Sequence, residues 1–437
     1  MNKKRLILRV LLISLAAIVG LLLICGAVML IEYRMLDDTS VSPEEAGKPL
    51  AEGEYRLPRL DVRTAGGAEI LTKTDYVDCT VTLSDVNAEN CFVDLPAGIR
   101  GRGNDTWKYY PKKPYRIKFE EKVSLFGEEK NKSWVLLAMY NDHSRIKDRM
   151  AFAMAESLDR DAFVPTHHYV ELYLNGEYNG LYLLTDQVDE NAGRTDVKDK
   201  FKAEDVEVPF LVELDSRAPE EGVEGVDWFA AGGYSYAIKY PEADERYNEA
   251  QFEYIKNYVT AVDMLCRREG VTLAELGAYV DVASLIDFYI VQEAMGQPEI
   301  NWKSVYMSRS SDGLLVMGPV WDFDWGAEGP SFGDSAHQYR DNVEGLRSDN
   351  NWFDCLLANS PEFRAALAAR WAEAKPLLQT AIDSVEAERE MLSRAARRDE
   401  LRWHWYRFGA DFEDRFDETV AWCRGRLDWL DTAFCAG

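Results

Sequence analysis

The sequence predicts an α+β protein with a β-rich N-terminal part, a helical C-terminal part and one transmembrane helix before them. Apolar and polar residues alternate between Ile70 and Val93, as they do in half-buried strands. Residues 244–297 and 361–434 read as mostly helical. An almost uninterrupted apolar run extends from Leu6 to Ile31.

The apolar run is long enough to cross a membrane. Counted from Val10 it has 22 residues, and a helix of about 20 residues spans a bilayer core of ~30 Å. A cleavable signal peptide has a shorter apolar core. Cys25 invites a lipoprotein interpretation, but Ile24 before it is too bulky for the usual processing site. We therefore expect residues 1–34 to form an uncleaved anchor.

Charge sets the orientation of this anchor. Basic residues precede the run and acidic residues follow it, so the positive-inside rule places the N-terminus in the cytoplasm. We expect a single-pass protein of the cell membrane whose C-terminal domain is extracytoplasmic. Residues 35–55 are acidic, contain Pro43 and Pro49, and are predicted to be a stalk. No clean linker divides residues 56–437, which are predicted to be one unit.

Several elements can be placed within this unit. Residues 144–158 have the pattern of an amphipathic helix, and residues 283–295 that of a buried helix. The segment from Tyr169 to Val188 predicts a hairpin that turns at Asn175-Gly176-Glu177. Outside the membrane, Cys79 and Cys91 could form a disulfide or remain two strand thiols, and the sequence leaves both open.

Composition excludes some functions. The net charge of −26 over 437 residues argues against non-specific binding to nucleic acid. Seven scattered cysteines and five histidines, without a Cys-x-x-Cys pair, argue against a zinc site. No haem, flavin or nicotinamide fingerprint is present.

The most informative residues are two carboxylates in Gly318-Pro-Val-Trp-Asp-Phe-Asp-Trp-Gly326. If this apolar segment is extended, Asp322 and Asp324 project from the same face. Burying two like charges costs several kcal/mol unless a cation or donor compensates them. Mg²⁺ or Mn²⁺ suits such an all-oxygen site. Solvated or arginine-paired aspartates at a strand end are the alternative.

A basic segment is the second chemical feature. Seven basic residues and one acid lie between Arg100 and Lys118. Gly101 and Gly103 flank Arg102, which allows close backbone approach to a bound anion. Arg116 and Lys118 would share one face of a strand, so the segment predicts a cradle for phosphates, or else a solvated edge strand. Lys239, in another strand-like segment, could also meet the phosphates or be structural.

Three long motifs carry a resemblance to a known family. They are "GIRGRGNDTWKYYPKKPYRIKFEEKVSLFG" with the helix after it, "VELYLNGEYNGLYLLTDQVD", and "INWKSVYM" followed by "GPVWDFDWG". In this order they resemble the spore-coat CotH kinase-like family, a group of atypical protein kinases. The resemblance covers roughly residues 95–330 as the motif core and continues weakly through the helical part, residues 331–437.

The resemblance implies an atypical kinase-like fold, ATP and Mg²⁺ (or Mn²⁺) as cofactors, and a protein acceptor such as a coat or envelope protein. Asp322, helped by Asp324, would ligate the metal, and Arg102, Arg116, Lys118 and Lys239 would neutralise phosphate charge. Glu299 would orient the acceptor hydroxyl or ligate a second metal. Lys118 resembles the strand lysine of kinases, which Asp186 could hold in place.

One departure from the family bears on activity. This chain has Gln297-Pro298-Glu299 where the family carries an aspartate in an Asn-x-Asp-like loop. The longer Glu299 side chain shifts the carboxylate by roughly 1 Å, and misplacement on that scale can cost about 10²-fold in rate. The leading hypothesis is a membrane-anchored phosphotransferase. The alternatives are a weakly active or inactive scaffold of the cell envelope or spore coat, and a carbohydrate-binding protein.

Overall fold

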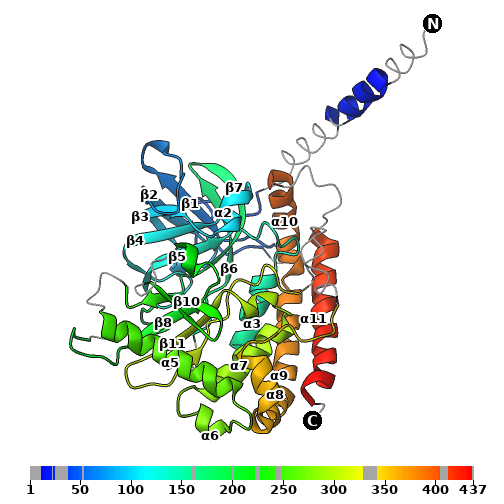
Figure 1. Cartoon of the computed structure of the whole chain (residues 1–437). Helices are drawn as coiled ribbons and strands as arrows, with labels where there is room; N and C mark the ends of the chain where they lie inside the picture. The colour runs from blue at the N-terminus through cyan, green and yellow to red at the C-terminus, as the bar shows by residue number, and fades with distance from the viewer. Residues whose placement is uncertain are drawn as a thin grey trace, which may run out of the picture.

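The structure is a computed structural model that describes residues 11–21, 23–24, 38–51, 54–159, 163–198, 201–221, 227–242, 248–327, 342–403 and 412–435. A closed β-barrel forms the N-terminal part, a second sheet lies below it, and helices cover the second sheet and one side of the molecule (Figure 1). The prediction of an α+β protein with a β-rich N-terminal part and C-terminal helices is confirmed.

Seven strands close the barrel in the order β1-β2-β3-β4-β5-β7-β6. All neighbours are antiparallel except β1 and β6, which pair in parallel and close the barrel. Inward-facing residues of every strand, such as Val81, Ile117 and Trp134, fill its core. The strands are β1 (Arg59–Thr64), β2 (Val77–Ser84), β3 (Phe92–Gly101), β4 (Tyr115–Val123), β5 (Asn131–Leu137), β6 (His168–Leu174) and β7 (Glu177–Asp186).

The predicted hairpin joins β6 to β7 through Asn175 and Gly176. Both residues have positive φ, 53° and 85°, as a two-residue hairpin turn requires, and Asn and Gly adopt this conformation at little cost. Local turn chemistry is therefore sufficient to predict this hairpin.

The second sheet has the order β12-β11-β8-β10-β9. Its central strand β8 is buried along its whole length, because β10 and β11 pair with its two edges and helices cover it. The strands are β8 (Phe210–Leu214), β9 (Trp228–Ala231), β10 (Tyr234–Tyr240), β11 (Val305–Arg309) and β12 (Val316–Met317).

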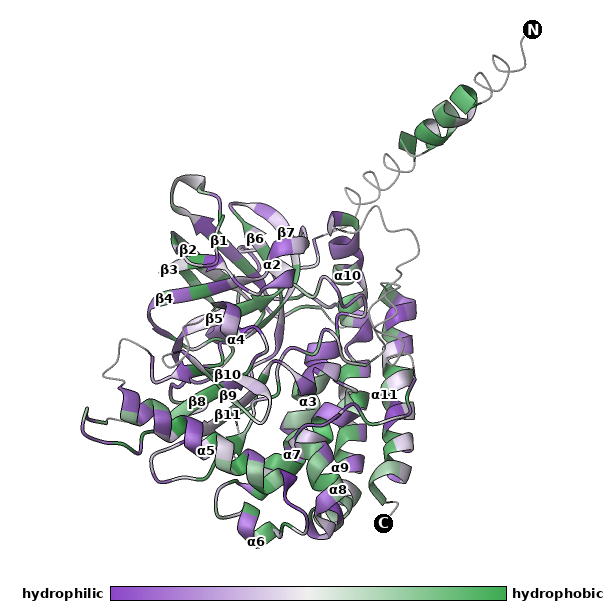
Figure 2. Cartoon of the chain, in the orientation of Figure 1, coloured by the Kyte–Doolittle hydropathy of each residue, from purple (hydrophilic) through white to green (hydrophobic). Residues whose placement is uncertain are grey.

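Helices supply most of the remaining core. Figure 2 shows α7 as a strongly hydrophobic helix, which agrees with its buried position. The helices of eight residues or more are α3 (Lys147–Ser157), α5 (Glu249–Arg267), α7 (Val282–Ala294), α8 (Trp352–Asn359), α9 (Pro361–Glu386), α10 (Arg389–Trp403) and α11 (Phe412–Cys435). The shorter ones are α2 (Asp105–Tyr109), α4 (Ala218–Glu221) and α6 (Leu273–Leu276).

Within the predicted stalk, residues 39–41 are packed against the barrel, whereas most of the described residues after them are exposed or half-buried. Ser40 forms a parallel bridge with Leu57, and Val41 is fully buried. Thr39 donates a hydrogen bond to Glu171 of the barrel at 2.6 Å. β6 and α10 supply partners for the polar groups of Asp38 and Thr39 at the start of the described stretch.

The predicted membrane anchor lies largely outside the described residues. Residues 11–21 and 23–24 are helical and hydrophobic (Figure 2). Across the described part of the chain, no helix is both long and apolar enough to cross a membrane.

Cys79 and Cys91 are free thiols. Cys79 lies opposite Ala97 in the β2–β3 register and is buried. The Cys91 thiol instead accepts a hydrogen bond from the backbone N–H of Asp85 at 3.3 Å.

Candidate functional site

A cavity of about 490 Å³ lies between the barrel and the second sheet. The barrel contributes Arg100 and Arg116 from β3 and β4, and the second sheet contributes Lys239 and Tyr306. The loop after β12 brings in Asp322 and Asp324. The cavity therefore joins the basic segment and the aspartate pair, which are far apart in the sequence.

The aspartate pair lies in a loop and not in the predicted strand. β12 ends at Met317, and Asp322 has φ +65°, in the left-handed region. Asp322 is held there by two contacts: Gln297 Nε2 donates to its backbone carbonyl at 2.5 Å, and Ser304 Oγ donates to its Oδ2 at 3.1 Å. Alternation of apolar residues suggested an extended chain, but both carboxylates reach the same cavity through a bend.

A third carboxylate, Asp148, lies beside this loop, and no sequence pattern assigns it a role there. It occupies the first turn of α3, is 7% exposed and lines the cavity. Its Oδ1 accepts a hydrogen bond from the backbone N–H of Phe323 at 2.7 Å. Burial, and after it the negative charge of Asp322, raises the pKa of Asp148 to about 7.

The clustered carboxylates disfavour their own ionisation. Burial and the neighbouring acids, of which Asp322 contributes most, raise the pKa of Asp324 well above its usual value. A bound cation would reverse this effect, because it stabilises the charged form of each carboxylate. Among the described residues, no group of three or more His, Cys, Asp or Glu has the arrangement of a complete metal site.

Glu299 forms an ion pair with a neighbouring lysine. It lies in a short 3₁₀ turn (Pro298–Asn301), is 2% exposed and forms an ion pair with Lys303 at 2.6 Å. Burial lowers the pKa of Lys303, but the charges of Glu299 and then Asp322 outweigh this effect and raise it overall. Lys303 lines the cavity, whereas Glu299 lies behind it.

The loop between β3 and α2 forms the opposite wall. Gly103 has φ +77°, and a Cβ there would lie 2.3 Å from Thr106 Oγ1, so any other residue would be strained and would require Thr106 to move. Lys73 Nζ donates to Asn104 Oδ1 at 2.7 Å and steadies the loop. Arg102 lies over the Trp321 ring, 5.7 Å from its centroid, and takes part in no ion pair with the described residues.

Two arginines behind this loop have N–H donors that form no hydrogen bond with the described residues. The Nε atoms of Arg100 and Arg116 are buried and find no hydrogen-bond acceptor among the described residues. Burial lowers the pKa of Arg116, and the charge of Arg100 contributes to the same effect. A buried donor without an acceptor costs about 1–3 kcal/mol, so an anion in the cavity would relieve both side chains.

Lys118 and Lys239 are placed differently. Lys118 is exposed and lines a neighbouring cavity of about 600 Å³, not the one that contains Asp322. Lys239 borders both cavities and forms an ion pair with Glu213 at 2.8 Å. Asp186 does not hold Lys118, because its carboxylate contacts Arg194 and accepts the N–H of Thr166.

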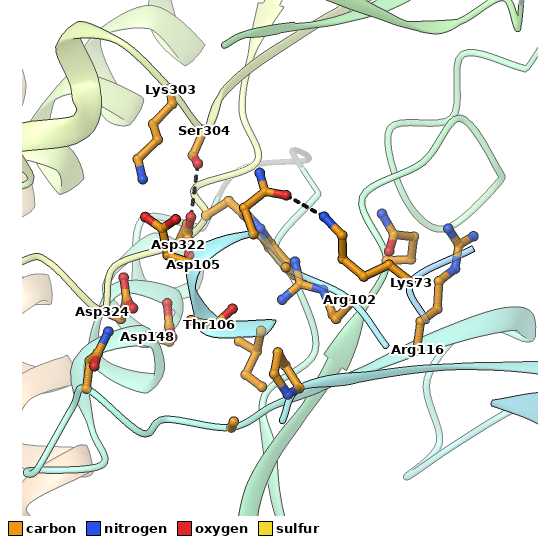
Figure 3. A pocket seen from close by; sticks show the side chains of 18 of the residues that line it. Lys73, Arg102, Asp105, Thr106, Arg116, Asp148, Lys303, Ser304, Asp322 and Asp324 are labelled. Carbon is orange, nitrogen blue, oxygen red and sulfur yellow. Dashed lines mark hydrogen bonds between the residues drawn. The ribbon is translucent and has the colours of Figure 1, made fainter. Parts of the chain in front are cut away.

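The three aspartates and the arginines lie on different sides of the cavity. Figure 3 shows Asp148, Asp322 and Asp324 on one side, with Lys303 near them, and Arg102, Lys73 and Arg116 on the other. The structure thus brings together five of the sequence-predicted residues, Arg102, Arg116, Lys239, Asp322 and Asp324. It adds Arg100, which belongs to the basic run, Asp148, an acid near the start of a predicted helix, and Lys73, which lies outside the basic run and had no signal in the sequence.

A family model described as CotH kinase protein matches residues 99–430. The match includes the loop of Arg102, the helix of Asp148 and the loop of Asp322. No curated protein matches the chain.

Proposed function

Because this chain belongs to the CotH kinase family, we propose that it is a phosphotransferase that moves a phosphoryl group from Mg-ATP to a hydroxyl of a protein. The family makes the protein kinase-like. The donor, the metal and the acceptor are our proposal.

The separation of charge within one cavity carries the proposal. A nucleotide bound to a divalent cation has the complementary arrangement, with the cation toward carboxylates and the phosphates toward guanidinium and ammonium groups. Mg²⁺ is usually held by one or two carboxylates, with water and substrate phosphates as its other ligands. Two aspartates without a third ligand group fit this mode of binding.

Different residues of the cavity would bind the cation and the phosphates. Asp322 and Asp324 would hold the cation, which when bound neutralises charge on the transferring phosphoryl group. Arg102 and Lys73 reach the cavity from the loop side and stabilise negative charge there. Arg100 and Arg116 provide buried donors for phosphate oxygens.

Glu299 would be the acid that orients the acceptor. Its ion pair with Lys303, which lines the cavity, connects the carboxylate to the cavity wall. To receive a proton from the acceptor hydroxyl, it must exchange this contact for one with the hydroxyl. The same ion pair favours the second candidate, a nucleotide-binding scaffold that transfers phosphate slowly or not at all.

The location of the activity follows from the N-terminal segment. We propose that the apolar run anchors the protein in the cell membrane and places the catalytic part outside the cytoplasm, next to a coat or envelope acceptor. The basic residues before the run and the acidic residues after it support this orientation.

The test compares the full-length protein with Asp322→Asn. ATP with Mg²⁺ at about 100 times Kd should stabilise the wild type by about 2.7 kcal/mol, measured as a rise in Tm, and labelled phosphate from ATP should appear on the protein or on an added acceptor. Asp322→Asn should fold, because asparagine also tolerates positive φ, and should lose both effects. The control Asp312→Asn, in the turn before β12, should retain them.

Two outcomes would contradict the proposal. Unchanged Mg-dependent stabilisation in Asp322→Asn would remove the cation site. If the wild type binds no nucleotide, the kinase-like function fails for this chain. Binding without transfer to any acceptor would favour the scaffold.

A further inference from the structure

The buried carboxylate of Asp148 is not explained by the roles given so far. We propose that Asp148 is a positioning residue of the cation site: it holds the Asp322–Asp324 loop and adds a third negative charge beside it. This inference rests on the proposed function, since it concerns the same site.

Asp148 holds the loop at the residue that lies between its two aspartates in the sequence. The N–H that it accepts belongs to Phe323, the residue that separates Asp322 from Asp324, and the distance of 2.7 Å is that of a strong hydrogen bond. Gln297 and Ser304 hold Asp322 from the other side. The loop is therefore fixed by contacts from α3, from the residue before the 3₁₀ turn and from the residue before β11.

Packing holds α3, and with it the hydrogen bond between Asp148 and Phe323, in place. Phe152, one turn further along α3, packs against Trp321 with ring centroids 6.0 Å apart. α3 also makes extensive contact with α9 and packs on α7. A displacement of α3 would consequently move the aspartate loop with it.

A purely structural role would not need a carboxylate at this position. The neutral oxygen of an asparagine accepts the same N–H without placing a third negative charge beside Asp322 and Asp324. Asp148, Asp322 and Asp324 all line the same cavity, and like charges within one buried site disfavour each other's ionised forms. A cation bound at the loop converts this repulsion into attraction, and that gain explains the aspartate.

The test separates the hydrogen bond from the charge. Asp148→Asn keeps an oxygen for the Phe323 N–H and removes only the charge, whereas Asp148→Ala removes both. A matched control is Asp281→Asn, where the carboxylate accepts the N–H of Ser284 at 2.8 Å at the start of α7, away from the cavity. Each full-length variant is titrated with Mg²⁺ at saturating ATP, and both the Tm shift and phosphate transfer are followed.

Asp148→Asn should raise the Mg²⁺ concentration for half-maximal effect by about 10- to 100-fold, the usual loss when a residue supporting metal ligands is replaced. Asp148→Ala should show the same shift and a lower kcat, because the loop is no longer held. The asparagine variant thus restores kcat relative to alanine but does not restore the Mg²⁺ dependence. Asp281→Asn should leave both quantities unchanged.

The proposal is overturned if Asp148→Asn and Asp148→Ala lower Tm without changing the Mg²⁺ dependence of a wild type that does respond to Mg²⁺. That result leaves the proposed function intact. If the wild type itself shows no Mg-dependent effect, both the proposed function and the role of Asp148 fail.

Discussion

At the scale of single residues, the site is defined by which charges already have partners. Glu299 is paired with Lys303, and Lys239 with Glu213. The Nε donors of Arg100 and Arg116, by contrast, find no acceptor among the described residues. The groups without partners are the ones that a phosphate would satisfy, and the paired groups must exchange contacts to take part.

Glu299 provides the first prediction at this scale. Glu299→Gln should keep Mg-ATP-dependent stabilisation and eliminate transfer, because the neutral amide cannot accept the hydroxyl proton. Glu299→Asp should raise transfer, by up to about 100-fold if the longer side chain misplaces the carboxylate by ~1 Å. The rate of labelled phosphate transfer, measured for the wild type and both variants, checks both expectations. Slower transfer in Glu299→Asp would mean that the surrounding loop already accommodates glutamate.

Gly103 provides the second prediction at the scale of single residues. Gly103→Ala should weaken ATP binding, because the new Cβ would lie 2.3 Å from Thr106 Oγ1 in addition to the strain of φ +77°. Gly66→Ala is the matched control, since Gly66 has φ +63° and a Cβ there would meet nothing within 4 Å. Both should lose about 1–2 kcal/mol of stability from the left-handed backbone, Gly103→Ala should lose more because of the added contact with Thr106, and only Gly103→Ala should raise the Kd for ATP. Equal Kd values would show that the loop is not part of the nucleotide site.

At the scale of elements, α10 joins the barrel to the helical part through buried charges. Asp399 of α10 contacts Lys112 at 2.6 Å and Arg145 at 3.1 Å, and all three side chains are fully buried. Arg398, next to it, contacts Glu171 of β6 at 3.0 Å. A C-terminal helix thus satisfies charges that the barrel and the loop before α3 cannot satisfy alone.

Removing the charge of Asp399 should destabilise the whole protein. Asp399→Asn would leave two buried cations with a neutral partner, and breaking a buried pair costs about 3–5 kcal/mol. Glu418→Gln, in the exposed pair of Arg415 and Glu418 on α11, should cost less than about 1 kcal/mol. Urea denaturation of both variants measures the difference. A loss below about 1 kcal/mol for Asp399→Asn, the range of an exposed pair, would show that α10 is held mainly by apolar contacts.

At the scale of the whole molecule, the cavity lies where three parts of the chain meet. The barrel brings Arg100 and Arg116, the second sheet and the loop after it bring Lys239 and the aspartate pair, and α3 brings Asp148. The barrel closes only because β1 pairs with β6, which lies far along the chain. The site therefore depends on long-range contacts throughout.

Membrane orientation is the prediction at this scale. Cys435, at the end of α11, is an exposed thiol, so a thiol reagent that cannot cross membranes should label it in intact cells if the folded part is extracytoplasmic. The Cys435→Ser variant should lose that labelling and controls for the other cysteines. Labelling of Cys435 that appears only after lysis would reverse the orientation.

The sequence by itself determined much of the local structure. The Asn175-Gly176 turn, the hairpin around it and the helices near residues 144–158, 283–295 and 361–434 follow from periodicity and turn chemistry, which act between residues close in the chain. The three motifs likewise indicate the family without reference to tertiary structure. Local patterns suffice for these features because neighbouring residues decide them.

Only the tertiary structure decided the rest. Asp148 contacts Phe323 across 175 residues, and no local pattern marks an aspartate in a helix turn as part of a distant loop. Alternation predicted a strand through Asp322, whereas the contacts of Gln297 and Ser304 hold a bend in the chain there. Lys118 lies on a strand, as its alternating pattern predicted, but its side chain lines the neighbouring cavity and not the one that contains Asp322. Burial and charge in this site are set by residues that folding brings together, so the sequence could name the chemical groups but not their arrangement.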